Sequence, residues 1–449
     1  MHCPAPTRAA AGANRRRPLR ATARRAGDAM NRSPQVPPAP ADFEEFVVVR
    51  RRYLLVTNIG YFVDEAGRVL LDRAWHHDLV QHLAYLPMLT LAAPRCPLSG
   101  AMGDLVALDE GTLCRFGLLP LPYAGSRFEA LLRLPMMCLA MWRAVGEADV
   151  VHAGIAGWPY PLGWLASVMT RLRGKKCVIV VESAPWRLSG QARSTGSFKD
   201  QLQSFVYERM ARWCCSHADV SFYTQPLYIE QLHGKRGTPA YVTPATWVNA
   251  EDVLSEVEAR ALWARKGHEP VRFLFAGRLV PEKGVNVLLE AVRMLDAAGL
   301  SGSIDIVGDG PLRETVVAAQ GTTSFALSYV APVPYGAPFF HLLQRYHAVI
   351  VPSLSDEQPR ILFDAAARAV PVLASDTDGL RPHVEDGKTG CLVRPGDAGA
   401  LKDAMTEWVR HPLLLEKYAM EALSRVRAQT HRAMHANRSR LLALHLAAS

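Results

Sequence analysis

Two cationic side chains follow an apolar run, typical of a buried strand, in the segment 273–284. The run ends at Gly277, and Arg278 and Lys283 lie five positions apart in the loop that follows. An expected helix starts just after Gly284, and free backbone N–H groups and the helix dipole favour an anion at such a start. Two cations beside a helix N-terminus can clamp a diphosphate. A solvated loop with an incidental Arg and Lys is the alternative interpretation.

A glycine-rich turn follows the next expected strand. It reads Gly-Asp-Gly-Pro over residues 308–311. A glycine directly after a strand lets a ligand approach the backbone closely, so Gly308 and Gly310 are candidate binding positions. An ordinary turn between strand and helix would use the same residue types, and that interpretation stays open.

Carboxylates and a helix start come together in residues 353–364. Asp356 precedes a helix expected to begin near Arg360, and Asp364 lies one turn inside it. The backbone N–H groups of Arg360, Ile361 and Leu362 would be free at the helix start and can donate to phosphate oxygens. Carboxylates accept hydrogen bonds from sugar hydroxyls. The alternative is an aspartate that only caps the helix.

Short apolar strands that alternate with helices surround these loops. This pattern is typical of parallel sheets covered on both faces, and it occurs twice along the 449 residues. We therefore predict an α/β protein of two doubly wound, Rossmann-like domains facing across a cleft. Ligands bind beyond the carboxyl ends of such strands, where all three candidate loops lie. The expected parts are a disordered basic tail (1–45), a first Rossmann-like domain (46–250), a linker (251–270), a second Rossmann-like domain (271–425) and a C-terminal helix that could pack back on the first domain (426–449).

Individual elements can be placed from the same patterns. Strands are expected at residues 46–49, 53–57, 89–92, 150–152, 177–181, 218–223, 240–242, 271–276, 303–307, 328–330, 348–351, 371–374 and 390–393. Helices are expected at residues 74–85, 161–172, 286–298 and 360–369. From Ala398 onward the chain should be helical in three pieces, broken at Pro412 and near Thr430.

The positive charge of the chain is unevenly distributed. The formal net charge is +9, but residues 1–40 hold eight arginines against Asp28, which leaves only +2 for the rest. Nucleic acid is therefore not an expected partner. The tail is a dispensable extension, a start site called too early (Met30 would be an ordinary start), or a basic arm that touches acidic lipid.

Cysteine and hydropathy patterns limit the class further. The eight cysteines form no C-x-x-C pair, and no histidine cluster completes a zinc set, so we predict no metal site. Reduced thiols suit a cytoplasmic protein. The longest strongly apolar run, residues 135–142, is far below the roughly 20 residues that span a bilayer.

Four stretches in order make a more specific signal. They are GRLVPEKG (277–284), VGDGP (307–311), PSLSDEQPRILFDAAARAVPVLASDTDG (352–379) and DGKTGCLVRPGD (386–397). Residues 273–397 thus resemble the donor domain of the family-4 retaining glycosyltransferases (glycosyl transferases group 1) of GT-B fold. The first domain matches more loosely, through ADVVH (148–152) and ADVSFYTQ (218–225).

The resemblance implies a role for each candidate in the second domain. Arg278 and Lys283 would hold the donor diphosphate, Asp356 would contact the transferred sugar, and Asp364 would contact the ribose. The family has glutamates, eight positions apart, where this chain has Asp356 and Asp364. Each carboxylate is one methylene shorter here, which would tighten the site, alter the donor or weaken activity. Glu357 is adjacent and would replace Asp356 if the loop shifted.

The resemblance also points to positions in the first domain. Gly60 follows the first strand, where such enzymes bring backbone near the donor, and Asn58 is a weaker candidate. Many relatives carry a histidine after the strand at 177–181, where this chain has Glu182. His152, at the end of the preceding strand, is the nearest alternative on the acceptor side. A histidine that only packs in the core or at a strand end is the commoner explanation for His152.

By the same resemblance, the chain would be a retaining hexosyltransferase. It would move a sugar from a nucleoside diphosphate to an acceptor hydroxyl without metal or other cofactor, and Arg278, Lys283 and Asp356 would act in catalysis. No residue is assigned as a nucleophile. Two other functions stay open: a GT-B sugar-nucleotide epimerase or hydrolase, and a non-catalytic binding or scaffold protein, which the two Glu-to-Asp changes motivate.

The acceptor is expected on the first domain. Residues 126–142 are basic at Arg127 and Arg133 and otherwise largely apolar. They fit either an ordinary buried helix or a helix that lies on a membrane surface near a lipid-linked acceptor. The second interpretation leads to a hypothesis of surface or exopolysaccharide assembly on the inner face of the cell membrane.

Overall fold

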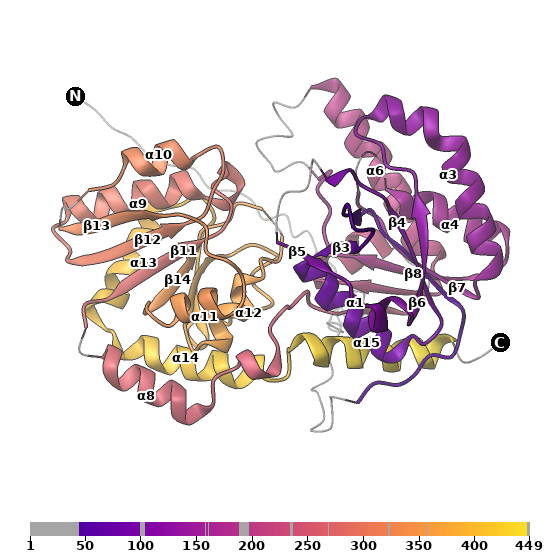
Figure 1. Cartoon of the computed structure of the whole chain (residues 1–449). Helices are drawn as coiled ribbons and strands as arrows, with labels where there is room; N and C mark the ends of the chain where they lie inside the picture. The colour runs from indigo at the N-terminus through magenta and orange to yellow at the C-terminus, as the bar shows by residue number, and fades with distance from the viewer. Residues whose placement is uncertain are drawn as a thin grey trace, which may run out of the picture. The chain divides into compact units, whose positions relative to one another are not determined.

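Two parallel sheets, each with its own helices, make up the part of the chain that the computed structural model describes (Figure 1). The described residues are 45–98, 104–157, 159, 161–187, 197–233, 237–267, 269–321, 324–355 and 357–446. The basic tail that we predict to be disordered lies almost wholly outside these residues, and so does Asp356.

The first sheet has seven parallel strands in the order β10-β9-β8-β7-β1-β4-β6. Their strongly apolar sequences suit burial on both faces. The strands are β1 (Tyr53–Val56), β4 (Leu89–Pro94), β6 (Phe116–Leu121), β7 (Val150–Gly154), β8 (Lys176–Val181), β9 (Val220–Tyr223) and β10 (Ala240–Val242).

Three long helices of the first domain begin at polar capping residues. Side chains of Asp72, Ser126 and Ser197 accept hydrogen bonds from backbone N–H groups in the first turns of α1, α3 and α6. The helices are α1 (Arg73–Tyr85), α2 (Glu110–Leu113), α3 (Arg127–Glu147), α4 (Leu162–Leu172), α6 (Phe198–His217) and α7 (Pro226–Tyr228), with a π-helical turn η2 (Ile229–His233). A small antiparallel sheet adds β2 (Phe62–Val63), β3 (Val69–Asp72) and β5 (Leu105–Ala107).

The second sheet has six parallel strands in the order β13-β12-β11-β14-β15-β16. The strands are β11 (Arg272–Ala276), β12 (Gly302–Val307), β13 (Phe325–Val330), β14 (Ala348–Val351), β15 (Val372–Ser375) and β16 (Gly390–Val393). The helices of this half are α8 (Glu256–Lys266), α9 (Val285–Ala297), α10 (Arg313–Ala318), α11 (Ala337–Leu343), α12 (Ile361–Ala367), α13 (Ala398–Arg410) and α14 (Leu413–Val426), with 3-10 turns η3 (Ala250–Asp252) and η4 (Pro281–Lys283).

The last helix, α15 (His431–Leu446), is far in sequence from the sheet on which it packs. It lies beside α1 (Figure 1, yellow against indigo). Its Leu442 and Leu446 are buried in the same core cluster as Tyr53 of β1 and Leu79 of α1. Burial of a leucine side chain contributes about 1.5–3 kcal/mol, so the two leucines hold this helix firmly to the first sheet.

The predicted fold class of two parallel-sheet α/β domains is confirmed. The three helical pieces after residue 398 are confirmed too, with breaks at Pro412 and Thr430. The strand predicted at residues 46–49 is wrong. Among the residues that the structure describes, no strand pairs with this segment, and the Val49 N–H instead donates to the Tyr85 carbonyl at the end of α1 (2.8 Å).

Several first-domain elements were not predicted. Strand β6 contains Pro120, which weakens a strand prediction, yet it sits at the edge of the sheet, where proline is tolerated. Helix α6 and the small antiparallel sheet were also missed. In the described part of the chain, each helix is too short or too polar to cross a bilayer.

Candidate functional site

Three loops meet at the carboxyl edge of the second sheet. They follow β11, β12 and β14, which are adjacent strands, so their ends lie side by side. Backbone hydrogen bonds join them: the Leu279 N–H donates to the Asp309 carbonyl (2.8 Å), and the Leu354 N–H donates to the Glu282 carbonyl (2.8 Å). The sequence placed the three candidate motifs after strands of one sheet, and the structure brings them into contact.

Glycine is required where these loops touch. Gly284 has a left-handed backbone (φ 73°), and a Cβ there would lie 1.8 Å from the carbonyl oxygen of Pro352. A Cβ on Gly308 (φ 150°) would lie 1.9 Å from the carbonyl oxygen of Gly277. No side chain fits at either place, so the two glycines let the backbone of the three loops close into one surface.

The two predicted diphosphate ligands stand in different surroundings. Arg278 is exposed, and its side chain makes no hydrogen bond or ion pair with any residue in the described ranges. Lys283, in the 3-10 turn before α9, is only 17% exposed, and its Nζ lies 3.2 Å from the Glu357 carboxylate. The thirteen-residue helix α9 begins directly after Gly284. Arg278, Lys283 and the N-terminus of α9 together make this loop electropositive.

Glu357, adjacent to Asp356, is thus a partner of Lys283 rather than an isolated carboxylate. The half-exposed ion pair contributes little to stability, because water screens it. A bound diphosphate would compete with Glu357 for the ammonium group of Lys283. Asp356 itself lies outside the described residues, so its predicted contact with the transferred sugar stays a prediction.

Asp364 is buried in the first turn of α12, as its spacing from the helix start predicts. The hydroxyl of Tyr335 donates to its Oδ1 (3.0 Å). Burial raises the pKa of this carboxyl from its usual 3.8 to about 7. At neutral pH the group is therefore poised between its acid and carboxylate forms, and it can donate or accept a hydrogen bond.

Two aromatic rings lie near the guanidinium of Arg360, the residue at the start of α12. The guanidinium of Arg360 lies 5.2 Å from the Trp247 ring centroid and 5.8 Å from that of Tyr335. Ile361 is buried. The N–H of Leu362 donates to the Pro359 carbonyl in a long bond (3.4 Å), so not every amide of this helix start is available, contrary to the prediction.

At the carboxyl edge of the first sheet, the loop after β1 packs tightly. A Cβ on Gly60 would lie 2.2 Å from Sγ of Cys96, which follows β4. The side chain of Asn58 accepts a hydrogen bond from the Leu162 N–H (3.0 Å) and so positions the start of α4. Asn58 therefore has a structural task. No contact with a donor is needed to explain it.

A cavity of about 200 Å³ opens beside this loop. It lies beyond the ends of β1, β4, β6 and β7, and α3 closes one side. Its walls are mostly apolar, with Arg133 as the cation. The lining residues include Asn58, Cys96, Tyr123, Arg133, Met137 and Leu162.

The two acceptor-side candidates differ in position. Glu182 follows β8 directly and is exposed at the carboxyl edge of the sheet. We predicted that His152 ends its strand, but β7 continues to Gly154. Its ring is buried, and its Nδ1 lies 3.1 Å from the hydroxyl of Tyr53. Burial holds the pKa of His152 well below its usual value, so this ring is neutral and faces the core.

Helix α3 is not an ordinary buried helix, which corrects one of the two interpretations of residues 126–142. Its buried side is narrow, and five large apolar side chains on it are between 51% and 70% exposed. Helix α6 carries four more, between 43% and 81% exposed. The exposed residues are Phe128, Leu131, Leu132, Met136 and Leu139 on α3, and Phe198, Leu202, Phe205 and Val206 on α6.

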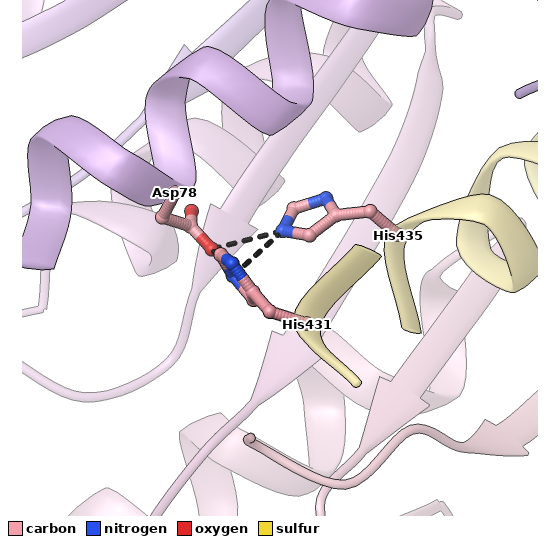
Figure 2. A group of neighbouring side chains, drawn as sticks. All are labelled: Asp78, His431 and His435. Carbon is pink, nitrogen blue, oxygen red and sulfur yellow. Dashed lines mark hydrogen bonds and ion pairs between the residues drawn. The ribbon is translucent and has the colours of Figure 1, made fainter. Parts of the chain in front are cut away.

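A cluster of Asp78, His431 and His435 was missed by sequence reasoning (Figure 2). The spacing of His431 and His435, four apart on α15, could have drawn attention to one helix face. Asp78 is on α1, more than 350 positions away, and no local pattern connects it to them.

Comparison with known proteins identifies what the chain is similar to. Residues 270–411 match the family model described as glycosyl transferases group 1. The chain is 23% identical to the alpha-D-kanosaminyltransferase of Streptomyces kanamyceticus, over 75% of this chain and 88% of that one. It is 31% identical to the phosphatidyl-myo-inositol mannosyltransferase of Mycobacterium leprae, over 39% of this chain and 46% of that one.

Solved structures share the fold over most of the chain. The sucrose-phosphate synthase of Thermosynechococcus elongatus superimposes with a TM-score of 0.64 at 19% identity, covering 89% of this chain and all of that one. HepE of Anabaena, solved in complex with UDP-glucose, has a TM-score of 0.59 at 13% identity, covering 87% and 98%. The predicted GT-B fold is therefore confirmed.

Proposed function

We propose that this chain is a group 1 glycosyltransferase that transfers a hexose from a nucleoside-diphosphate sugar to an acceptor hydroxyl with retention of configuration. The observation that carries the proposal is the joined surface of three backbone loops beside Arg278, Lys283 and the start of α9. HepE, which shares the fold, was solved with UDP-glucose, and this supports a donor of the same chemical class.

The diphosphate would lie against Arg278 and Lys283. As the sugar–oxygen bond breaks, negative charge grows on the leaving diphosphate, and preorganised cations and helix N–H groups stabilise it. Lys283 would exchange its contact with Glu357 for the phosphate. We infer that these groups act without a metal at the donor site, because two side-chain cations already stand where a divalent ion would otherwise balance the phosphates.

The sugar and ribose would contact the paired aspartates. We assign Asp356 to the transferred sugar and Asp364 to the ribose, with Tyr335 holding the second carboxyl in place (3.0 Å). A carboxyl with a pKa near 7 can accept a hydrogen bond from a ribose hydroxyl or donate one to it. Because each aspartate is one methylene shorter than a glutamate, the donor would have to lie closer to the backbone of the site in order to contact both carboxylates.

The cavity at the end of the first sheet is our candidate for the acceptor. Its volume of about 200 Å³ is smaller than the few hundred Å³ typical of drug-sized ligands, so it suits one sugar or the start of a lipid chain. Arg133 would meet an acceptor phosphate there. Met137 and Leu162 offer apolar contact, and Gly60 and Glu182 lie at the same edge of the sheet.

The exposed apolar side chains of α3 and α6 favour an acceptor that is carried on a membrane. The two helices flank α4, and the Arg127 guanidinium donates to the Gln203 side chain across them (3.1 Å). Arg133, which lines the cavity, is also exposed on α3. We therefore propose peripheral contact with anionic lipid and a lipid-linked acceptor in cell-surface glycan assembly.

A panel of UDP-, GDP- and ADP-sugars tests the donor. We expect one nucleotide class to raise the melting temperature, because a ligand that binds only the folded state stabilises it. Turnover in the presence and absence of acceptor then separates a transferase from an epimerase or hydrolase, which would need no acceptor. Proton NMR of the anomeric centre reads retention directly. If no nucleotide sugar binds, the scaffold function replaces the enzyme.

Vesicle binding tests the membrane contact. Replacement of both Leu131 and Leu132 by serine should lower cosedimentation with anionic vesicles at least tenfold, because two leucines would no longer be buried in lipid. Leu413→Ser, at a site 79% exposed on α14, is the matched control and should bind as the unmodified chain does. Equal binding by the double variant would exclude this face as the membrane contact.

A further inference from the structure

Three potential metal ligands converge in a buried position between α1 and α15 (Figure 2). Asp78 comes from α1, while His431 and His435 come from the first two turns of α15. His431 is 1% exposed and His435 is fully buried, whereas the side chain of Asp78 keeps 15% of its exposure. The cluster is remote in sequence from the three loops after β11, β12 and β14, which we call the donor loops.

The three ligand atoms form a nearly equilateral triangle. Nε2 of His431 and Nε2 of His435 lie 3.1 and 3.0 Å from Oδ1 of Asp78, and the two nitrogens lie 3.2 Å from each other. Zinc binds such atoms at about 2.0–2.2 Å, so neighbouring ligands of a tetrahedral ion are roughly 3.3 Å apart. An ion placed about 1 Å above the triangle would reach all three atoms.

A cation is compatible with the proton positions in the cluster. If both Nε2 atoms carried a hydrogen, two N–H groups would face each other at 3.2 Å while competing for one carboxylate oxygen. A cation removes the conflict, because each Nε2 then presents its lone pair. The Nδ1 of His435 would donate to the Tyr85 hydroxyl (3.1 Å), the kind of outer contact that orients metal-bound histidines.

The surroundings are rigid and largely aromatic. His431 stacks with Trp247 (centroids 5.4 Å apart) and with His77 (4.8 Å). Nδ1 of His82 lies 3.1 Å from Oδ2, the second carboxylate oxygen of Asp78. The atoms of Asp78 and His435 that would not bind the ion are therefore fixed by His82 and Tyr85, as is usual for metal ligands.

We propose that Asp78, His431 and His435 bind one Zn²⁺ that fastens α15 to α1. Two histidine nitrogens, four positions apart on α15, and one carboxylate oxygen from α1 match the ligand preferences of this ion. The site stands where the chain enters its last helix: the N–H of His431 donates to the Val248 carbonyl (2.7 Å). The role is structural, and it does not rest on the proposed sugar transfer.

Metal analysis of the full chain, purified without a histidine tag, is the first test. We expect about one zinc per chain, loss of the zinc on dialysis against a chelator, and a melting temperature that falls by several degrees and recovers with ZnCl₂. Absence of zinc, together with a melting temperature that ZnCl₂ does not change, would mean that the three side chains are only hydrogen-bonded.

Cobalt provides a readout that needs no variant. The chelated chain, titrated with CoCl₂, should develop the visible absorption bands of a tetrahedral ion with nitrogen and oxygen ligands. The described cysteines are unpaired, and ligation by them would instead add strong thiolate charge-transfer bands in the near ultraviolet. Such bands, or no visible bands at all, would overturn the assignment.

Two conservative variants then identify the ligands. His435→Gln and Asp78→Asn should each lower zinc affinity at least a hundredfold and remove the response of the melting temperature to ZnCl₂. His411→Gln is the control, because His411 is exposed and pairs only with Glu407 (3.6 Å). Full zinc affinity in both ligand variants would place the ion elsewhere and contradict the proposal.

Discussion

The donor loops and the Asp78 cluster are built in opposite ways. The loops touch through their backbones, at Gly284 and Gly308, and their side chains project from that frame. The cluster is made of side chains from two helices, and Asp78 lies 353 and 357 positions before His431 and His435. A site framed by backbone keeps its shape when side chains are replaced, whereas a cluster of side chains loses its geometry when one member is replaced.

The contrast extends to electrostatics. Lys283 and Glu357 are partly exposed, so water screens their attraction. The two histidines of the cluster are almost fully shielded, and their Nε2 atoms have the Asp78 carboxylate and each other as neighbours. We therefore expect substitutions of charged side chains in the donor loops, such as Lys283, to change catalysis more than stability, and substitutions of side chains in the cluster to do the reverse.

The largest effect should come from Lys283→Ala. Loss of one preorganised cation at the leaving group should lower kcat/KM by roughly 10²–10³. The melting temperature should stay nearly the same, because the ion pair with Glu357 is weak. Lys388→Ala removes an exposed lysine that pairs with Glu385 (3.1 Å) and is the control. Unchanged turnover in the Lys283 variant would remove the diphosphate clamp from the mechanism.

The second effect tests whether backbone contact holds the loops together. Gly284→Ala should cost roughly 3 kcal/mol of unfolding free energy, since its Cβ meets the Pro352 carbonyl. Gly299 has a similar backbone (φ 68°) with nothing within 4 Å, so Gly299→Ala isolates the conformational cost of about 1 kcal/mol. Equal losses in urea denaturation would show that the loops do not depend on this contact.

The third effect is a pH dependence centred on Asp364. Its pKa is raised from 3.8 to about 7 on folding, so the folded state favours the protonated form. The resulting stability is complete below pH 3.8 and is lost as the pH rises through 7. Compared with Asp364→Asn, the unmodified chain should lose roughly 2–3 kcal/mol between pH 5 and pH 8. Parallel stability curves for the two proteins would contradict the shift.

The smallest effect concerns the support of the cluster. Tyr85→Phe removes only the hydroxyl that contacts His435 and should cost about 1 kcal/mol in urea denaturation. If the ion is bound as proposed, zinc affinity should fall roughly 10- to 100-fold as well. Tyr241→Phe, which removes a hydroxyl contact to His445 on the same helix (2.6 Å), should leave zinc affinity unchanged.

Much of the second domain could be predicted from local patterns. Strand β12 and helices α9 and α12 lie within two residues of their expected bounds, because short apolar runs and glycine turns signal βα units directly. The first domain was harder. Strand β6 contains a proline that is acceptable only because the strand lies at an edge, a fact that no local pattern contains.

The sequence by itself determined the family resemblance, the two parallel sheets and the three loops that follow neighbouring strands, since each depends on residues close together in the chain. Tertiary structure alone decided that Glu357 faces Lys283, that Asp364 is buried against Tyr335, and that His152 faces the core. It also brought Asp78 to His431 and His435. Contacts between distant segments depend on how helices pack onto sheets, and periodicity in one segment carries no information about its remote partner.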